Sequence, residues 1–285
     1  MGIRLENVCY TYGSDTTSEI KALNNVNLEI NKGEFVAIIG HTGSGKSTLI
    51  QHFNGLERPK SGNVFYNDEN IYENNYDLRK LRCKVGLVFQ YPEHQLFEMT
   101  IFKDVCYGPK NMGLNDADVE KAAKEALDLV GLDESFYDKS PFELSGGQKR
   151  RAAIAGILAM KPRVLVLDEP TAGVDPRGRN EIFDAINHMH HETGITVILV
   201  SHSMEDVAKY ADRIIVMNQG RVALTGTPRE VFSRVSLLEE IGLAAPQTSY
   251  VMKGLSDKGY SVAQDIYTVD EATEVLYDLL KQVKK

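Results

Sequence analysis

The segment Gly40-His-Thr-Gly-Ser-Gly-Lys46-Ser47 follows the apolar run Glu34-Phe-Val-Ala-Ile-Ile39 and precedes a stretch with helical character from Lys46 to Leu56. Its glycines allow consecutive backbone N–H groups to turn inward around an anion without a Cβ clash. A helix that starts directly after the loop adds partial positive charge from its N-terminus. A buried strand, a glycine loop and a helix in this order predict a nucleotide phosphate site in an α/β protein.

The spacing Gly-x4-Gly-Lys-Ser assigns separate tasks within the loop. We expect Lys46 to neutralise oxygens of the β- and γ-phosphates of ATP, and the Ser47 hydroxyl to coordinate Mg²⁺. A helix-capping glycine turn with a surface lysine is the alternative, and the flanking strand and helix disfavour it. The residues predicted to surround the nucleotide phosphates are Gly40, His41, Thr42, Gly43, Ser44, Gly45, Lys46, Ser47 and Thr48.

Two acids follow another apolar run, Val164-Leu-Val-Leu167. A carboxylate at the end of a buried strand must face a cleft or a cation, and the carboxyl end of a parallel strand faces the ligand crevice. We therefore predict Asp168 as a Mg²⁺ partner and Glu169 as the base that polarises the attacking water. Taken alone, the pair could be an acidic cap between a strand and a loop.

The order of strand and helix patterns predicts the architecture. Residues 3–8 and 23–30 alternate apolar and polar positions, as half-buried strands do, whereas fully apolar runs predict buried strands at 34–39, 84–89, 163–167 and 196–200. A helix is predicted at 178–191, and a hairpin turn at Asn218-Gln-Gly220. Together these patterns predict an α/β core with a mostly parallel sheet, an antiparallel β lobe, and an inserted helical subdomain over about 95–160, which includes a helix at 116–130.

The character of the sequence changes after about residue 240. Ala244-Ala-Pro246 interrupts regular structure, and Thr268-Val-Asp-Glu271 is a capping box that opens a helix to about Lys281. We expect an ATPase domain over 1–240 and a small C-terminal helical module over 241–285. The module either packs onto its own domain or acts as a dimerisation element, and the sequence favours neither.

Composition narrows the classes of function. The chain has 285 residues, a formal net charge of −8 and a pI of about 5.5, so no broad basic face is predicted for nucleic acid. No apolar run approaches the roughly 20 residues that a membrane-spanning helix needs. Cys9, Cys83 and Cys106 are far apart and are expected to be reduced, mostly buried thiols. The cluster 188–192, with three histidines, does not converge on one helix face and is expected to be solvated surface rather than a metal site.

The segment Leu144-Ser-Gly-Gly-Gln148 adds a family resemblance. Together with the phosphate loop and Leu167-Asp-Glu-Pro-Thr171, it resembles the nucleotide-binding domain of ABC transporters, and the match runs from about residue 3 to 235. The resemblance implies the fold of a P-loop ABC ATPase. It also implies that the signature loop of one subunit closes on the γ-phosphate held by another, with contacts from Ser145, Gly146, Gly147 and Gln148.

The resemblance assigns further roles to single residues. Tyr12 looks like the aromatic residue that stacks on adenine, and Tyr10 is the neighbouring candidate. Gln90 looks like the glutamine that touches Mg²⁺ and water and senses the membrane partner. His202 looks like the switch histidine at the γ-phosphate. Asp175 looks like the loop acid that crosses the dimer interface, although the family more often has leucine before it.

A narrower resemblance concerns the ATPases of energy-coupling factor (ECF) importers of vitamins and metals. The loop at 39–46, Gln90-Tyr-Pro-Glu-His-Gln-Leu-Phe97, 107–111 and 155–160 are similar to those ATPases, in particular to the second of their two related subunits. The resemblance implies that 92–97 belongs to a groove that receives the transmembrane coupling subunit. It also implies a separate substrate-binding membrane subunit, a peripheral place on the cytoplasmic face of the cell membrane, and pairing with a related ATPase or with a second copy of this chain.

Three alternatives compete with this assignment. The chain could serve another ABC importer, for example one of cobalt or nickel. A soluble ABC ATPase acting on nucleic acid or ribosomes is disfavoured, because only 96 residues (48–143) separate Ser47 from Leu144 and no heptads occur between them. A degenerate, regulatory ATPase is disfavoured because no catalytic motif is missing.

Overall fold

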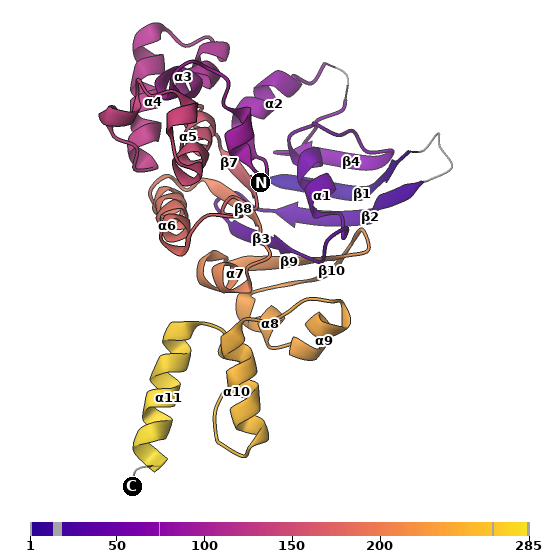
Figure 1. Cartoon of the computed structure of the whole chain (residues 1–285). Coiled ribbons are helices and arrows are strands. Elements are labelled where there is room, and N and C mark those ends of the chain that lie inside the picture. Colours follow the sequence, from indigo (N-terminus) through magenta and orange to yellow (C-terminus); the bar gives the residue numbers. More distant parts are fainter. Residues whose placement is uncertain (1, 14–18, 74, 264, 284–285) are drawn as a thin grey trace.

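The computed structural model describes residues 2–13, 19–73, 75–263 and 265–283, and it contains two sheets (Figure 1). The larger sheet has the order β10-β9-β3-β8-β7-β6. It consists of β3 (Phe35–Ile39), β6 (Val85–Val88), β7 (Val164–Asp168), β8 (Thr196–Val200), β9 (Arg213–Asn218) and β10 (Arg221–Gly226). All its pairings are parallel except that of β9 with β10, so the predicted mostly parallel sheet is confirmed.

The smaller sheet is the predicted antiparallel lobe, and its order is β2-β1-β4-β5. It consists of β1 (Ile3–Tyr12), β2 (Ile20–Ile30), β4 (Ser61–Tyr66) and β5 (Glu69–Asn70). The first two strands are longer than predicted, and β1 reaches Tyr12. The alternation of apolar residues stops before Tyr12, but pairing of Tyr12 with Ile20 continues the ladder. The short strands β4 and β5 were not predicted, because half of their residues are exposed.

Some helices cover the larger sheet, others form the inserted subdomain, and the last two lie at the C-terminal end. The α-helices of the described residues are α1 (Lys46–Phe53), α2 (Leu78–Lys84), α3 (Ile101–Asn111), α4 (Asp116–Leu129), α5 (Gly146–Leu158), α6 (Pro176–Thr193), α7 (Met204–Tyr210), α8 (Pro228–Phe232), α9 (Val235–Glu240), α10 (Gln247–Asp257) and α11 (Val269–Val283). Helices α3, α4 and α5 lie together at one end of the molecule and confirm the helical subdomain (Figure 1). The helix predicted to reach Leu56 ends at Phe53.

The central strands are fully apolar because both faces of the sheet are covered. In β7, Leu165 and Leu167 point into a core shared with α6 and the helical subdomain. Val164 and Val166 point the opposite way, into a core shared with the antiparallel lobe and α1. Continuous apolar runs, rather than alternation, are typical of parallel strands buried on two faces.

One prediction about α6 was wrong. His190 is buried, its Nδ1 lies 2.7 Å from the Ile195 carbonyl oxygen, and its ring meets Phe35 edge-on. His188 and His191 are exposed as expected. Among the described residues, no group of three or more His, Cys, Asp or Glu side chains is arranged to hold a metal ion. His190 is therefore a packing residue, and its bond to the Ile195 carbonyl oxygen also holds the turn after α6.

The cysteines agree with the prediction only in part. All three are free, but only Cys106 is buried, while Cys9 and Cys83 are half-buried.

No helix in the described part of the chain is long and apolar enough to cross a membrane.

The last two helices pack on each other. A small core of their own consists of Met252 of α10, Ile266, which precedes α11, and Ala272 of α11. The predicted cap of α11 is present, because the Glu271 N–H donates to the Thr268 hydroxyl. Ion pairs from Arg229 to Asp265 and Glu271 connect this pair of helices to α8.

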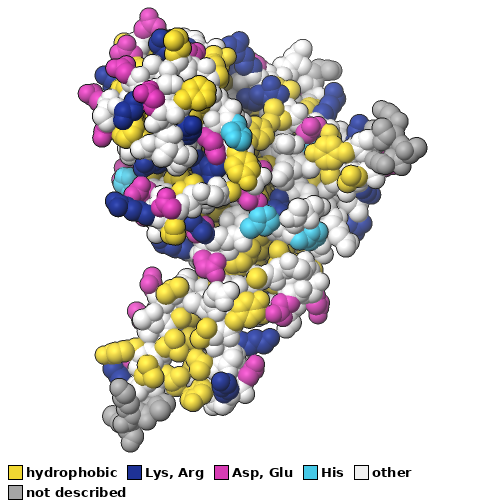
Figure 2. Space-filling view, viewed as in Figure 1, with side chains coloured by type: hydrophobic (Ala, Val, Ile, Leu, Met, Phe, Trp, Pro, Cys, Tyr) yellow, Lys and Arg dark blue, Asp and Glu magenta, His cyan; other side chains and the backbone are white. Residues whose placement is uncertain are grey.

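Figure 2 shows hydrophobic side chains gathered over this part of the molecule, and large exposed ones there are Val251, Val269, Tyr277 and Leu280. The division at residues 240 and 241 stays a prediction.

We predict that Phe183→Ala lowers the free energy of unfolding by about 3–5 kcal/mol. Phe183 is 1% exposed and stacks on Tyr210 at 5.1 Å between α6 and the sheet, so truncation leaves a cavity. Phe142→Ala is the matched control, because Phe142 is 92% exposed and should change stability by less than about 0.5 kcal/mol. Urea unfolding followed by circular dichroism measures both, and equal losses would contradict the packing described here.

Candidate functional site

The phosphate loop joins β3 to α1 and is held tightly against its neighbours. Gly45 has a φ of +102°, and a Cβ there would lie 2.4 Å from the Ala22 carbonyl oxygen. A Cβ on Gly40 would lie 2.5 Å from the Met217 carbonyl oxygen. Ser44 accepts a hydrogen bond of 3.0 Å from the Gly220 N–H in the turn between β9 and β10. These contacts make the glycines necessary at both ends of the loop.

Lys46 is the first residue of α1, and its ammonium lies back over the loop. Its Nζ donates to the carbonyl oxygens of Gly40 at 2.7 Å and His41 at 3.1 Å. Burial lowers the pKa of Lys46, while the nearby carboxylates of Glu169 and Asp168 oppose this shift. The loop thus presents a desolvated positive charge beside a helix N-terminus, which is an arrangement that binds phosphate.

The two predicted carboxylates lie at the carboxyl end of β7. Asp168 is buried and accepts a hydrogen bond from the Ser47 side chain. Burial raises the pKa of Asp168, and the bond from Ser47 opposes that shift. Glu169 leaves the strand with a φ of +49°, and its N–H donates to the Val200 carbonyl oxygen at 3.0 Å. This turn directs the Glu169 side chain away from the sheet and toward the loop.

Glu169 contacts the other two residues predicted to act in catalysis. Its Oε1 lies 2.7 Å from Nε2 of His202, which follows β8. Gln90, which follows β6, donates from Nε2 to Glu169 Oε2 at 3.4 Å. Because β6, β7 and β8 are parallel neighbours, their carboxyl ends bring the three side chains together.

A cavity of about 380 Å³ contains six of the nine predicted loop residues, together with Tyr12 and the three residues predicted to act in catalysis. It is lined by Tyr12, Ile20, Ala22, Thr42, Gly43, Gly45, Lys46, Ser47, Thr48, Gln90, Glu169 and His202. Of the remaining loop residues, Gly40 and Ser44 are buried. His41 turns to the side, where its Nε2 lies 3.1 Å from Asn218 Oδ1. The contacts of Ile20, Ala22 and Asn218 were missed, because their positions in the sequence give no signal.

Tyr12, rather than Tyr10, is available to a ligand. Tyr12 is 41% exposed, and its hydroxyl lies 3.1 Å from Thr48 Oγ1. The Tyr10 hydroxyl donates to Glu57 at 2.5 Å, and this bond together with burial raises the pKa of Tyr10 to about 12. Tyr10 also packs edge-on against Tyr12, with 4.9 Å between ring centroids, and this contact helps to fix the orientation of the Tyr12 ring.

The other predicted residues lie around a second cavity of about 450 Å³. Ser145 caps α5, where it accepts a bond from the Gln148 N–H while Gln148 bonds back to its backbone. Asp175 caps α6, and the N–H groups of Gly178 and Arg177 lower its pKa. Gly146 and Gly147 also line this cavity, but no residue of the phosphate loop does. The structure therefore separates the predicted nucleotide residues into two sets.

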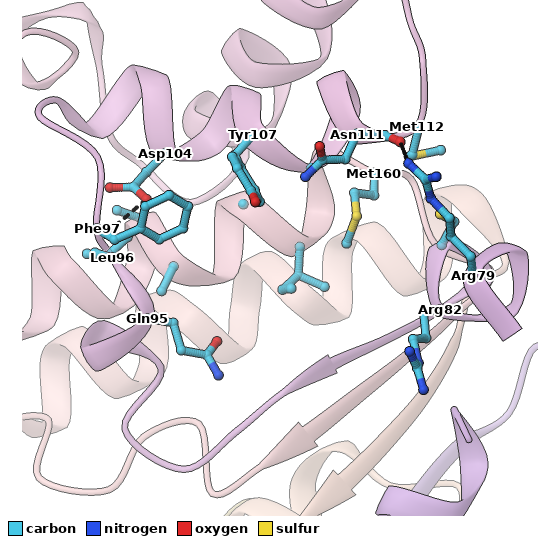
Figure 3. A pocket seen from close by; sticks show the side chains of 16 residues that line it. Arg79, Arg82, Gln95, Leu96, Phe97, Asp104, Tyr107, Asn111, Met112 and Met160 are labelled. Carbon is cyan, nitrogen blue, oxygen red and sulfur yellow. Dashed lines mark hydrogen bonds between the residues drawn. The ribbon is translucent and has the colours of Figure 1, made fainter. Parts of the chain in front are cut away.

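A third cavity, of about 400 Å³, lies between α2, α3 and α5 (Figure 3). Gln95, Leu96 and Phe97 line it, which places the second half of the predicted groove segment 92–97 at its edge. Figure 3 shows Tyr107 and Asn111 of α3 on one side and Arg79 and Arg82 of α2 on another. Pro92, in contrast, is buried.

Comparison with known proteins places this geometry in a family. Residues 23–172 match the ABC transporter family. The chain is 55% identical over 277 residues to the energy-coupling factor transporter ATP-binding protein EcfA2 of Clostridium tetani, covering 97% of this chain and 96% of that one. It is 49% identical over 278 residues to the protein of the same name from Streptococcus pyogenes, covering 97% and 99%.

Solved structures agree with the sequence relatives. The chain is similar to cbiO1 of Clostridium perfringens, described as part of the ABC transporter complex cbiONQ, with 41% identity, a TM-score of 0.74, and coverage of 88% of this chain and 98% of that one. It is also similar to the ATP-binding cassette MJ0796, solved as a dimer in a post-hydrolysis state bound to ADP and Pi, with 33% identity, a TM-score of 0.72, and coverage of 79% and 98%. The chain belongs to the ABC transporter ATPase family, among the ATP-binding proteins of energy-coupling factor transporters.

Proposed function

We propose that this chain binds Mg²⁺ and ATP, hydrolyses ATP, and thereby drives an importer of vitamins or other micronutrients. The observation that carries the proposal is the separation of the nucleotide residues into two cavities on one chain. The first cavity holds the phosphate loop with Glu169, and the second holds Ser145 with Asp175. Neither cavity has all the groups that the reaction needs, so two subunits must meet to complete each site.

The chemistry of the first cavity fits hydrolysis. Glu169 is placed to orient and activate the attacking water, since Gln90 and His202 fix both of its oxygens. His202 is half-exposed and lines the same cavity as Lys46, and we propose that it contacts the γ-phosphate there.

The donor set beside Lys46 fits a magnesium ion. Ser47, Asp168 and Gln90 offer hydroxyl, carboxylate and amide oxygens, which suit a hard divalent cation. When bound, Mg²⁺ would neutralise phosphate charge. Asp168 already orients the Ser47 hydroxyl toward this position.

The second cavity fits the role of completing another subunit's site. Ser145 and the following N–H groups form a helix N-terminus at the surface, which attracts a γ-phosphate. The dimeric relative bound to ADP and Pi supports this arrangement. The second ATPase is a related chain or another copy of this one, and closure and reopening of the pair supply the conformational change.

The groove at Gln95–Phe97 is the proposed docking place of a transmembrane coupling subunit. It begins five residues after Gln90, so a displacement there can reach Glu169 through one short segment. The relatives named for energy-coupling factor transporters support transmembrane partners, and the proposal adds a further membrane subunit that binds the substrate. With these partners, the chain would lie on the cytoplasmic face of the cell membrane, without contact to nucleic acid.

Capture of the tagged chain from solubilised native membranes, followed by mass identification, tests the function as a whole. We expect a second ABC ATPase, or this chain itself, together with at least one membrane protein. Phe97→Glu, at the exposed edge of the groove, should lose the membrane protein and keep the ATPase partner. Enrichment of ribosomes or nucleic acid in place of membrane proteins would refute the proposal.

Glu169→Gln tests the base. We expect ATP affinity within about threefold of the parent and a fall in turnover of about 10²–10⁴-fold, because the amide cannot accept the proton of the attacking water. Glu192→Gln, on the exposed end of α6, is the matched control and should hydrolyse ATP normally. Phosphate release under saturating ATP measures both variants, and near-normal turnover by Glu169→Gln would refute the assignment.

Tyr12 gives a test of adenine recognition. Tyr12→Ala should weaken ATP binding by about tenfold or more, because stacking of a base on an aromatic ring contributes about 1–3 kcal/mol. Tyr12→Phe loses only the contact with Thr48 and should stay within about threefold of the parent. Titration with a fluorescent ATP analogue distinguishes them, and equal affinities for all three proteins would exclude stacking on Tyr12.

A further inference from the structure

Arg150 is a buried charge that no predicted role explains. It lies on the second turn of α5, five residues after Ser145, and is 2% exposed. Its Nε and Nη2 donate to the two carboxylate oxygens of Glu93 at 3.0 and 2.8 Å, and its Nη1 donates to the Ala172 carbonyl oxygen. Burial favours the neutral form of Glu93, but the bonds from Arg150 outweigh it and lower the pKa of Glu93. Burying a guanidinium costs free energy even when each of its three nitrogens donates a hydrogen bond, so such a residue indicates that its geometry is needed.

The three segments that meet at Arg150 belong to different parts of the chain. Glu93 lies in the 3-10 helix Pro92–Gln95, three residues after Gln90 and two before Gln95, which lines the groove. Ala172 directly precedes the loop Gly173–Asp175. Arg150 itself belongs to the helix whose first turn carries Ser145.

The second cavity is built from two of these segments. One wall is Ser145–Gln148 of the helical subdomain, and the other is 173–178, which follows the core strand β7. Arg150 is the buried connection between the walls, and the ion pair from Arg151 to Glu181 at 3.1 Å is a more exposed one. A bidentate guanidinium fixes angles as well as distances, and a lysine cannot replace it.

We infer that Arg150 is a positioning residue that holds Ser145 and Asp175 in register for the nucleotide bound by the other subunit, and that Glu93 links this register to the groove. The inference rests on the proposed function. The groove segment and the face toward the partner then move as one unit. A membrane subunit that shifts the segment after Gln90 would change the other subunit's ATP site as well as this subunit's own.

The test separates nucleotide binding from closure of the pair. In a Glu169→Gln background, which retains ATP, we would measure ATP-driven dimerisation by size-exclusion chromatography, both for two copies of this chain and for this chain with its paired ATPase. Arg150→Met and Arg150→Lys should weaken dimerisation by about tenfold or more, and Glu93→Gln by less, because its amide keeps one acceptor. No membrane subunit is present, so loss of docking cannot cause the effect of Glu93→Gln.

Two readouts distinguish positioning from a general loss of structure. The affinity of the monomer for ATP should stay close to that of Lys161→Met, the control that breaks the exposed ion pair to Glu125. The melting temperature of the Arg150 variants should fall, because Glu93 loses its buried partner, but it should stay above the temperature of the dimerisation measurement. If the Arg150 variants dimerise like this control, or lose ATP affinity together with dimerisation, the inference is wrong. If the Glu169→Gln parent forms no ATP-dependent dimer with either partner, the proposed function fails instead.

Discussion

The chain has to keep opposite charges close together at the buried edge of an apolar sheet. Lys46, Asp168 and Glu169 lie where fully buried strands end, and none of them is stable there without a partner. The loop carbonyls bond the ammonium, Ser47 bonds Asp168, and Gln90 and His202 bond Glu169. The parallel order of β3, β8, β7 and β6 is what brings these groups to one edge, so the fold and the site depend on the same constraint.

A second constraint is the reason for which we propose that two subunits are needed for hydrolysis. The helix N-terminus that carries Ser145 opens on a different cavity from the one that holds the phosphate loop. Both are anion-binding features, and in the proposed function a single ATP uses both when two subunits face each other. On that proposal, the helical subdomain serves the other subunit's nucleotide, and its orientation on the core affects hydrolysis there. Arg150 acts at this junction between subdomain and core.

The C-terminal helices α10 and α11 are held by contacts that are separate from those of the nucleotide cavities. They bury a small core between themselves and are tied to α8 through Arg229, yet they leave large apolar side chains on the surface (Figure 2). The segments that line the cavity at Lys46 and the cavity at Ser145, among them the first turns of α1 and α5, lie away from this module (Figure 1). The sequence had left open whether the module packs onto its own domain, and in the structure Leu243, Ala245, Tyr250 and Tyr267 pack into a cluster with residues of α7, α8 and the larger sheet.

Local patterns were enough to predict the phosphate loop, the acids after β7, the buried strands and the helical subdomain, because periodicity and turn chemistry are properties of neighbouring residues. They did not predict the short strands β4 and β5 or the burial of His190, and they gave no physical reason for preferring Tyr12 to Tyr10, a preference that came from the family resemblance. Those depend on pairing and packing between distant segments, such as Tyr10 with Glu57 and His190 with Phe35. Only the tertiary structure separated the nucleotide residues into two cavities and enclosed Arg150 between Glu93 and Ala172, because the distance between such groups is set by how the subdomain lies on the sheet.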